Sequence, residues 1–182
     1  MILNIPIMLT YLRIVAIPVL VILHYLDYPF VTAFVFGMAG FTDWADGFLA
    51  RRWGQESRFG AFLDPVADKL MVAVALILVV DAQNSMWVTV AAAIIISREL
   101  LVSALREWMA EVGQRSKVAV AFIGKLKTAA QMMSLICLLY DKPLFGLPMH
   151  EVGLGLLGIA TVLTVWSMIH YLADAFRPAS DS

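Results

Sequence analysis

Long apolar stretches alternate with short polar turns along the whole chain, and this pattern predicts helices that cross a membrane. Such a helix needs about 20 residues, and the turn residues separate six stretches of roughly that length. We therefore predict an all-α integral membrane protein that forms one domain over residues 1–182. Its six transmembrane helices are expected at approximately 5–25, 30–50, 59–80, 86–106, 125–140 and 152–171.

Two of these stretches are long enough to cross a bilayer only if they include charged residues. Only 13 apolar or neutral residues precede Asp43 in the second stretch, and the uninterrupted apolar part of the third, 70–80, has 11 residues. The second span must then continue to about Ala50 and the third must begin near Phe59. Four aspartates therefore fall inside the predicted helices, and ionisable groups in a membrane are functional candidates by default.

The distribution of basic residues predicts the orientation. Of the 13 Lys and Arg residues, only Lys142 falls in a loop on the side opposite to the N-terminus. Cytoplasmic loops carry an excess of Lys and Arg, so the side shared by both termini is predicted to be cytoplasmic. Every charged half-span then lies at that end, and we expect the six helices to surround a polar cavity that opens to the cytoplasm.

Composition agrees with a membrane protein, because 62% of the residues are hydrophobic, 15% are charged and the mean hydropathy is +0.85. The net charge of −1 gives no reason to expect a nucleic-acid partner. The single cysteine, Cys137, cannot form an internal disulfide.

The aspartates of the second and third spans belong to the motif D-x2-D-G-x2-A-R-x8-G-x3-D-x3-D. In helices, Asp43 and Asp46 share one face, and Gly60, Asp64 and Asp68 share another. Four adjacent carboxylates would repel one another, and a pair of hard divalent ions such as Mg²⁺ or Mn²⁺ removes that cost. Two functions fit these features: an enzyme that acts on a lipid at the cytoplasmic leaflet, and a transporter that uses the aspartates as ligands for cations or protons.

The residues between the aspartates favour the enzyme. Gly47 and Ala50 leave room for a ligand to approach the backbone, as does Gly60 on the facing helix. Each of these small residues also suits tight helix packing, so the argument depends on their joint spacing. Arg51 is a natural partner for a phosphate beside the metal pair.

The complete motif resembles, without departure, the signature of the CDP-alcohol phosphotransferases. The stretches at 4–14, 97–111 and 124–132 are similar to bacterial members that use sn-glycerol 3-phosphate as acceptor. This resemblance implies a homodimer of six-helix subunits in the bacterial cytoplasmic membrane, among membrane lipids. The implied reaction transfers the phosphatidyl group of CDP-diacylglycerol to sn-glycerol 3-phosphate and releases CMP.

The resemblance also implies roles for the matching positions. Two metal ions would be bound by Asp43, Asp46, Asp64 and Asp68, and Asp68 would also be the general base. The CDP part of the donor would be held by the remaining motif residues, which are Gly47, Ala50, Arg51 and Gly60.

The phosphate of the acceptor is a dianion and calls for a cluster of donors. The candidates are Ser103, Arg106, Arg115, Lys125 and Lys127, of which Arg106 and Lys125 are preferred because they lie at span ends facing the cavity. Anchorage to anionic lipid headgroups explains Arg115 and Lys117 equally well. Arg98 and Glu99 are expected to pair with each other or with a neighbouring helix. Other acceptors, such as inositol phosphate or serine, stay open at this point.

Overall fold

The computed structural model describes residues 5–53, 58–111 and 122–175, and over these ranges the chain is helical with short turns. The described ranges contain no β-strand, which confirms the predicted all-α class. Six helices are present in them: α1 (Ile5–Tyr25), α2 (Pro29–Trp53), α3 (Arg58–Gln83), α4 (Met86–Glu111), α5 (Phe122–Tyr140) and α6 (Met149–Ala175).

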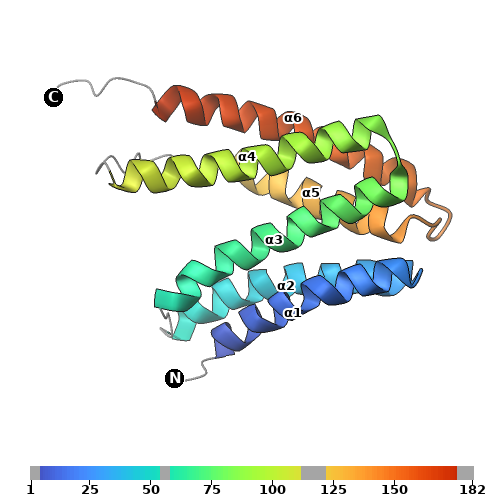
Figure 1. The fold of residues 1–182 in the computed structure, drawn as a ribbon, viewed down its shortest axis with the longest axis horizontal. Helices are drawn as coiled ribbons and strands as arrows, with labels where there is room; N and C mark the ends of the chain where they lie inside the picture. The colour runs from blue at the N-terminus through green and yellow to red at the C-terminus, as the bar shows by residue number, and fades with distance from the viewer. Residues whose placement is uncertain (1–4, 54–57, 112–121, 176–182) are drawn as a thin grey trace.

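The helices pack as two groups on either side of α3 (Figure 1). The first group is α1 and α2, and the second is α4, α5 and α6, with α5 also packing against α2 and α3. At one end of the bundle α1 begins, α2 ends, α3 begins and α6 ends; we call this the motif end. The three turns 26–28, 84–85 and 141–148 lie at the other end, which we call the turn end (Figure 1).

Asp and Asn residues with positive φ follow the helices at the turn end. The φ angles are 57° at Asp27, 42° at Asn84 and 50° at Asp141. Short polar side chains tolerate this left-handed conformation better than other non-glycine residues do, so they can end a helix. The third span, predicted to end near residue 80, therefore continues as α3 through Asp81 to Gln83 before Asn84 ends it.

Two helices continue beyond the predicted spans. Helix α4 continues past Arg106 to Glu111. Helix α6 begins at Met149, three residues before the predicted sixth span, and includes Glu151 in its first turn. An acidic residue in the first turn of a helix is favoured by the helix dipole.

The predicted start of the third span, near Phe59, is confirmed, because α3 begins at Arg58. Pro65 follows seven residues later, inside the helix. The proline therefore removes the hydrogen bond that the carbonyl of Ala61 would otherwise accept. This irregularity falls directly after Asp64, within the motif.

The core of the bundle is formed by apolar side chains from every group of helices. Phe36, Met71, Ile95 and Leu135 are all fully buried and come from α2, α3, α4 and α5. Helices α5 and α6 pack closely at Gly153. A Cβ atom there would lie 2.7 Å from Cγ of Leu138, and the Gly153 carbonyl accepts a 2.8 Å hydrogen bond from the Ser134 hydroxyl.

Two helices of the described ranges are long and apolar enough to cross a membrane. They are Met86–Met109 in α4 and Met149–Ala173 in α6. Shorter apolar segments occur in α1, α2 and α5, at Thr10–Tyr25, Pro29–Thr42 and Leu126–Tyr140. The fold is therefore consistent with a membrane protein, although fewer helices pass the length criterion than the six spans predicted.

Candidate active site

The motif occupies two helix segments that meet at the motif end. Asp43 and Asp46 lie in the last three turns of α2, and Asp64 and Asp68 lie in the first three turns of α3. This confirms the prediction, made from span lengths, that all four aspartates belong to helices.

For several predicted site residues the structure describes the backbone alone. They are Asp43, Asp46, Gly47, Ala50, Arg51, Gly60, Arg106 and Lys125. Arg115 and Lys117 fall in 112–121, outside the described residues altogether. The structure thus describes the side chains of four predicted site residues, which are Asp64, Asp68, Ser103 and Lys127.

Asp64 is held by a residue of the first helix. The hydroxyl of Thr10, which is fully buried, donates a hydrogen bond to Oδ1 of Asp64. A carboxylate has about four acceptor sites, so this bond fixes its orientation and leaves Oδ2 able to bind a cation. Hydrogen bonds of this kind commonly orient metal-binding carboxylates.

Asp68 lies one helical turn after Asp64, and the next residue, Lys69, connects α3 to α4. The ammonium of Lys69 donates a hydrogen bond to the hydroxyl of Ser103. Both carboxylates and the Lys69 side chain are partly buried. Ser103, predicted as a direct ligand of the acceptor, is therefore bonded to a cation that the sequence reading had not assigned.

Glu99 connects three helices at the centre of a second polar cluster. Its Oε1 accepts a 2.5 Å bond from Nζ of Lys127 on α5 and a 3.0 Å bond from Nη1 of Arg98. Nη2 of Arg98 in turn donates a 3.1 Å bond to the hydroxyl of Ser167 on α6. The prediction that Arg98 and Glu99 pair with each other or with a neighbouring helix is confirmed in both respects.

Lys127, a predicted ligand of the acceptor phosphate, is mostly enclosed in this cluster. Its side chain is 6% exposed and is oriented by Glu99. A fixed, desolvated ammonium can recognise phosphate strongly. For this residue to bind the acceptor, the phosphate must reach into the bundle between α4 and α5.

Sequence reasoning missed residues whose contribution depends on contacts between helices. Thr10 and Arg13 are both buried in α1, and they are spaced i, i+3 in an otherwise apolar helix. That spacing was a usable signal, because two polar residues on one face of an apolar helix indicate a polar neighbour. Lys69 and Ser167 gave no comparable signal.

The described side chains fit a site for hard divalent cations, although they make up only half of the predicted one. Asp64 and Asp68 present carboxylate oxygens on successive turns of one helix, and Thr10 already orients the first of them. Carboxylate oxygens are the ligands that Mg²⁺ and Mn²⁺ prefer. Among the residues whose side chains are described, no group of three or more metal-binding side chains converges. Asp43 and Asp46 of α2 are not among those residues, because their side chains are not described.

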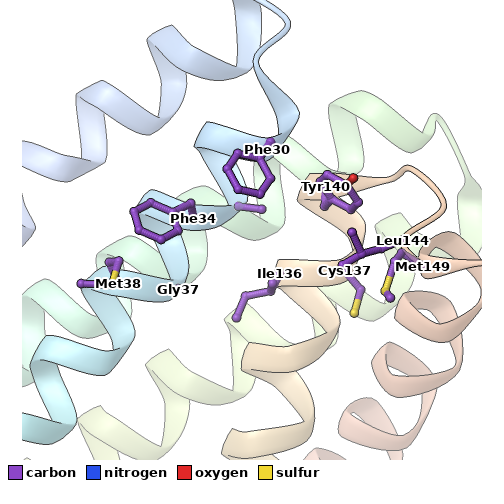
Figure 2. Close-up of a pocket in the computed structure, with 10 residues that line it drawn as sticks. Phe30, Phe34, Gly37, Met38, Ile136, Cys137, Tyr140, Leu144 and Met149 are labelled. Atoms are coloured by element: carbon purple, nitrogen blue, oxygen red, sulfur yellow. The ribbon is translucent and has the colours of Figure 1, made fainter. Parts of the chain in front are cut away.

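A separate groove lies between α2 and α5, toward the turn end, and has a volume of about 300 Å³ (Figure 2). Phe30, Phe34 and Met38 of α2 face Ile136 and Tyr140 of α5 across it. Its lining includes no charged side chain, so it cannot stabilise the charges of a phosphoryl-transfer reaction. The described carboxylates and cations of the predicted site lie outside this groove, toward the motif end.

Comparison with known proteins identifies relatives of the chain. Residues 3–168 match the family described as CDP-alcohol phosphatidyltransferase. The chain is 53% identical over 175 residues to the CDP-diacylglycerol–glycerol-3-phosphate 3-phosphatidyltransferase of Salmonella typhimurium, covering 94% of each protein. It is 53% identical to the protein of the same name from Shigella flexneri, and 54% identical to that from Haemophilus influenzae, covering 93% of the latter.

Proposed function

We propose a reaction from one premise: this chain belongs to the CDP-alcohol phosphatidyltransferase family. It is an enzyme that transfers the phosphatidyl group of CDP-diacylglycerol to sn-glycerol 3-phosphate, giving phosphatidylglycerophosphate and CMP. The observation that carries this proposal is the identity of more than half of the aligned residues, over 94% of the chain, to relatives named for this reaction. An ion-transport function, which the aspartates alone left open, has no such support.

The outer surface of the bundle supports a location in the membrane, where the lipid donor resides. Only 28% of the apolar segment of α4 and 22% of that of α6 are buried within the structure. A long apolar helix that a single chain leaves mostly uncovered is typical of contact with lipid. We place the chain in the bacterial cytoplasmic membrane as one multi-pass domain and as a homodimer, with the motif end facing the cytoplasm.

The orientation follows from the charges at the two ends. The turns at the turn end contain one of the 13 Lys and Arg residues, Lys142. The positive-inside rule then assigns the turn end to the outer side. The cytoplasm, which supplies soluble sn-glycerol 3-phosphate, would thus have direct access to the polar clusters at the motif end.

Asp43 and Asp46 from α2 and Asp64 and Asp68 from α3 would hold a pair of Mg²⁺ or Mn²⁺ ions. When bound, such a pair neutralises the pyrophosphate of the donor and the charge that develops on departing CMP. Arg51 would pair with a donor phosphate. The small residues Gly47, Ala50 and Gly60 would leave space for the nucleotide.

In the chemical step, a hydroxyl oxygen of the acceptor forms a bond to the phosphorus that carries diacylglycerol. The bond from that phosphorus to the CMP oxygen breaks, and CMP leaves with the electron pair. Asp68 takes the hydroxyl proton as the attack proceeds, which is general-base catalysis. Its partly buried position one turn beyond Asp64 allows it to bind a metal ion at the same time.

The acceptor site would lie on the other side of α3, toward α4 and α5. Glycerol 3-phosphate presents a dianion, and four of the predicted donors are on these two helices: Ser103, Arg106, Lys125 and Lys127. The fifth predicted donor, Arg115, lies outside the described residues. Of these donors, Lys127 is already oriented by Glu99. A neutral acceptor such as serine would not require so many cations.

A panel of acceptors tests the proposal. Purified protein in detergent with Mg²⁺ or Mn²⁺ is incubated with CDP-diacylglycerol and one alcohol at a time, and CMP release is measured. We expect release with sn-glycerol 3-phosphate and little with serine, inositol phosphate or no acceptor. Equal release with the other alcohols would contradict the acceptor assignment, and no release with any alcohol would contradict the enzyme assignment.

A further inference from the structure

Lys69 is a cation that neither the motif nor the predicted acceptor cluster includes. It directly follows Asp68 on α3, so the two Cα atoms are about 3.8 Å apart. Its partly buried ammonium donates to the hydroxyl of Ser103 on α4. A lysine side chain has high rotamer freedom, and a partner on a neighbouring helix restricts that freedom.

The neighbourhood of Lys69 connects both halves of the active site. A small cavity of about 40 Å³ between α3 and α4 has a mostly apolar lining, and its two charged lining residues are Lys69 and Glu99. Glu99 is the residue that orients Lys127 and Arg98. Lys69 therefore directly follows Asp68, the proposed base, and borders the same cavity as Glu99.

The hydrogen-bond partner of Lys69 indicates the function of the Lys69 charge. Partly buried ammonium groups that serve the fold alone are usually paired with carboxylates. Among the described residues Lys69 forms no ion pair, and its hydrogen-bond partner is a neutral hydroxyl. A neutral partner orients the ammonium without cancelling its charge, which leaves that charge available to an anion.

The acceptor needs a cation at this place. In sn-glycerol 3-phosphate only three carbons separate the reacting hydroxyl from the phosphate, so the phosphate must bind close to the base. Lys acts on phosphate as a compact point charge with three donors. We propose that Lys69 binds the acceptor phosphate and that Ser103 is a positioning residue that aims the Lys69 ammonium. This inference rests on the proposed function.

Steady-state kinetics of variants tests it. For Lys69→Met we expect the KM for sn-glycerol 3-phosphate to rise about tenfold or more, the effect of losing a hydrogen bond to a charged group. The KM for CDP-diacylglycerol should stay within about twofold, since the donor binds elsewhere. Lys69→Arg, which keeps the charge, should recover most of the loss. Lys142→Met at the turn end is the matched control and should behave as wild type.

The alternative is that Lys69 and Ser103 only join two helices. Lys69→Met would then lower thermal stability or kcat without a selective rise in the KM for the acceptor, and Lys69→Arg would give no selective recovery; that result would overturn the proposal. If Lys69→Met does not fold, Ser103→Ala decides by the same KM comparison, with a smaller selective rise expected. Failure of the proposed function is seen separately, because the wild-type protein would then not use sn-glycerol 3-phosphate.

Discussion

Glu99→Gln is the substitution whose effect the structure defines most closely. The Glu99 carboxylate lies 2.5 Å from Nζ of Lys127 and 3.0 Å from Nη1 of Arg98, and it joins α4 to α5. Glutamine keeps the length of the side chain and one acceptor oxygen but removes the negative charge. The change therefore isolates the electrostatic part of the cluster.

The expected loss of stability follows from how far each partner is exposed. Removing one partner of a fully buried ion pair costs about 3–5 kcal/mol, whereas exposed pairs contribute about 0.2–1 kcal/mol. The Lys127 side chain is 6% exposed and that of Glu99 is 28% exposed, so the pair is between these limits. We expect a loss of about 2 kcal/mol, which for a chain of this length lowers Tm by about 4–8 °C.

Thermal unfolding of the protein in detergent, followed by intrinsic tryptophan fluorescence, measures this shift. Glu107→Gln is the matched control, because Glu107 is in the same helix and exposed. Its Tm should stay within about 1 °C of the wild type, as is usual for surface substitutions. Equal shifts for Glu99→Gln and Glu107→Gln would refute the reasoning, since burial of the pair would then make no difference.

Three other predictions concern packing, the base and the metal. Gly153→Ala should destabilise the protein by about 1–3 kcal/mol, because its Cβ would lie 2.7 Å from Cγ of Leu138. Gly158→Ala, which has no heavy atom within 4 Å of the added Cβ, should not lower Tm; a drop of the same size there would contradict the packing argument. Asp68→Asn should keep nucleotide binding, measured by calorimetry, and lose transfer by about 10²–10⁴-fold, the usual contribution of a general base; near-normal turnover would remove Asp68 from that role. Chelation with EDTA should abolish CMP release, and added Mg²⁺ or Mn²⁺ should restore it; activity that persists without divalent ions would contradict the two-metal proposal.

The helical architecture could be predicted because bilayer thickness sets the length of each helix. Thirteen apolar residues before Asp43 are too few to cross a membrane, so the helix had to continue through the aspartates. The structure confirms this, with α2 ending at Trp53. The exact helix ends could not be predicted, because a single residue with positive φ, such as Asn84, decides where α3 stops.

The polar contacts of the site could not be predicted from the sequence, for a different reason. Thr10 and Asp64 are 54 positions apart, and Lys69 and Ser103 are 34 apart. Whether two such residues meet depends on how each helix is rotated about its axis, which a single sequence does not determine. The motif identified the carboxylates, and the structure was needed to find the residues that orient them.

The bond between Lys69 and Ser103 has a thermodynamic consequence for how the affinities for metal and acceptor depend on each other. Lys69 directly follows Asp68, so if Asp68 binds a metal ion, its position would be linked to that of the ammonium that we assign to the acceptor. Binding equilibria linked in this way are reciprocal: if metal ions raise the affinity for the acceptor by some factor, the acceptor raises the affinity for the metal by the same factor. Occupancy of one half of the site would then prepare the other, and titrations of metal and acceptor in either order should give the same coupling.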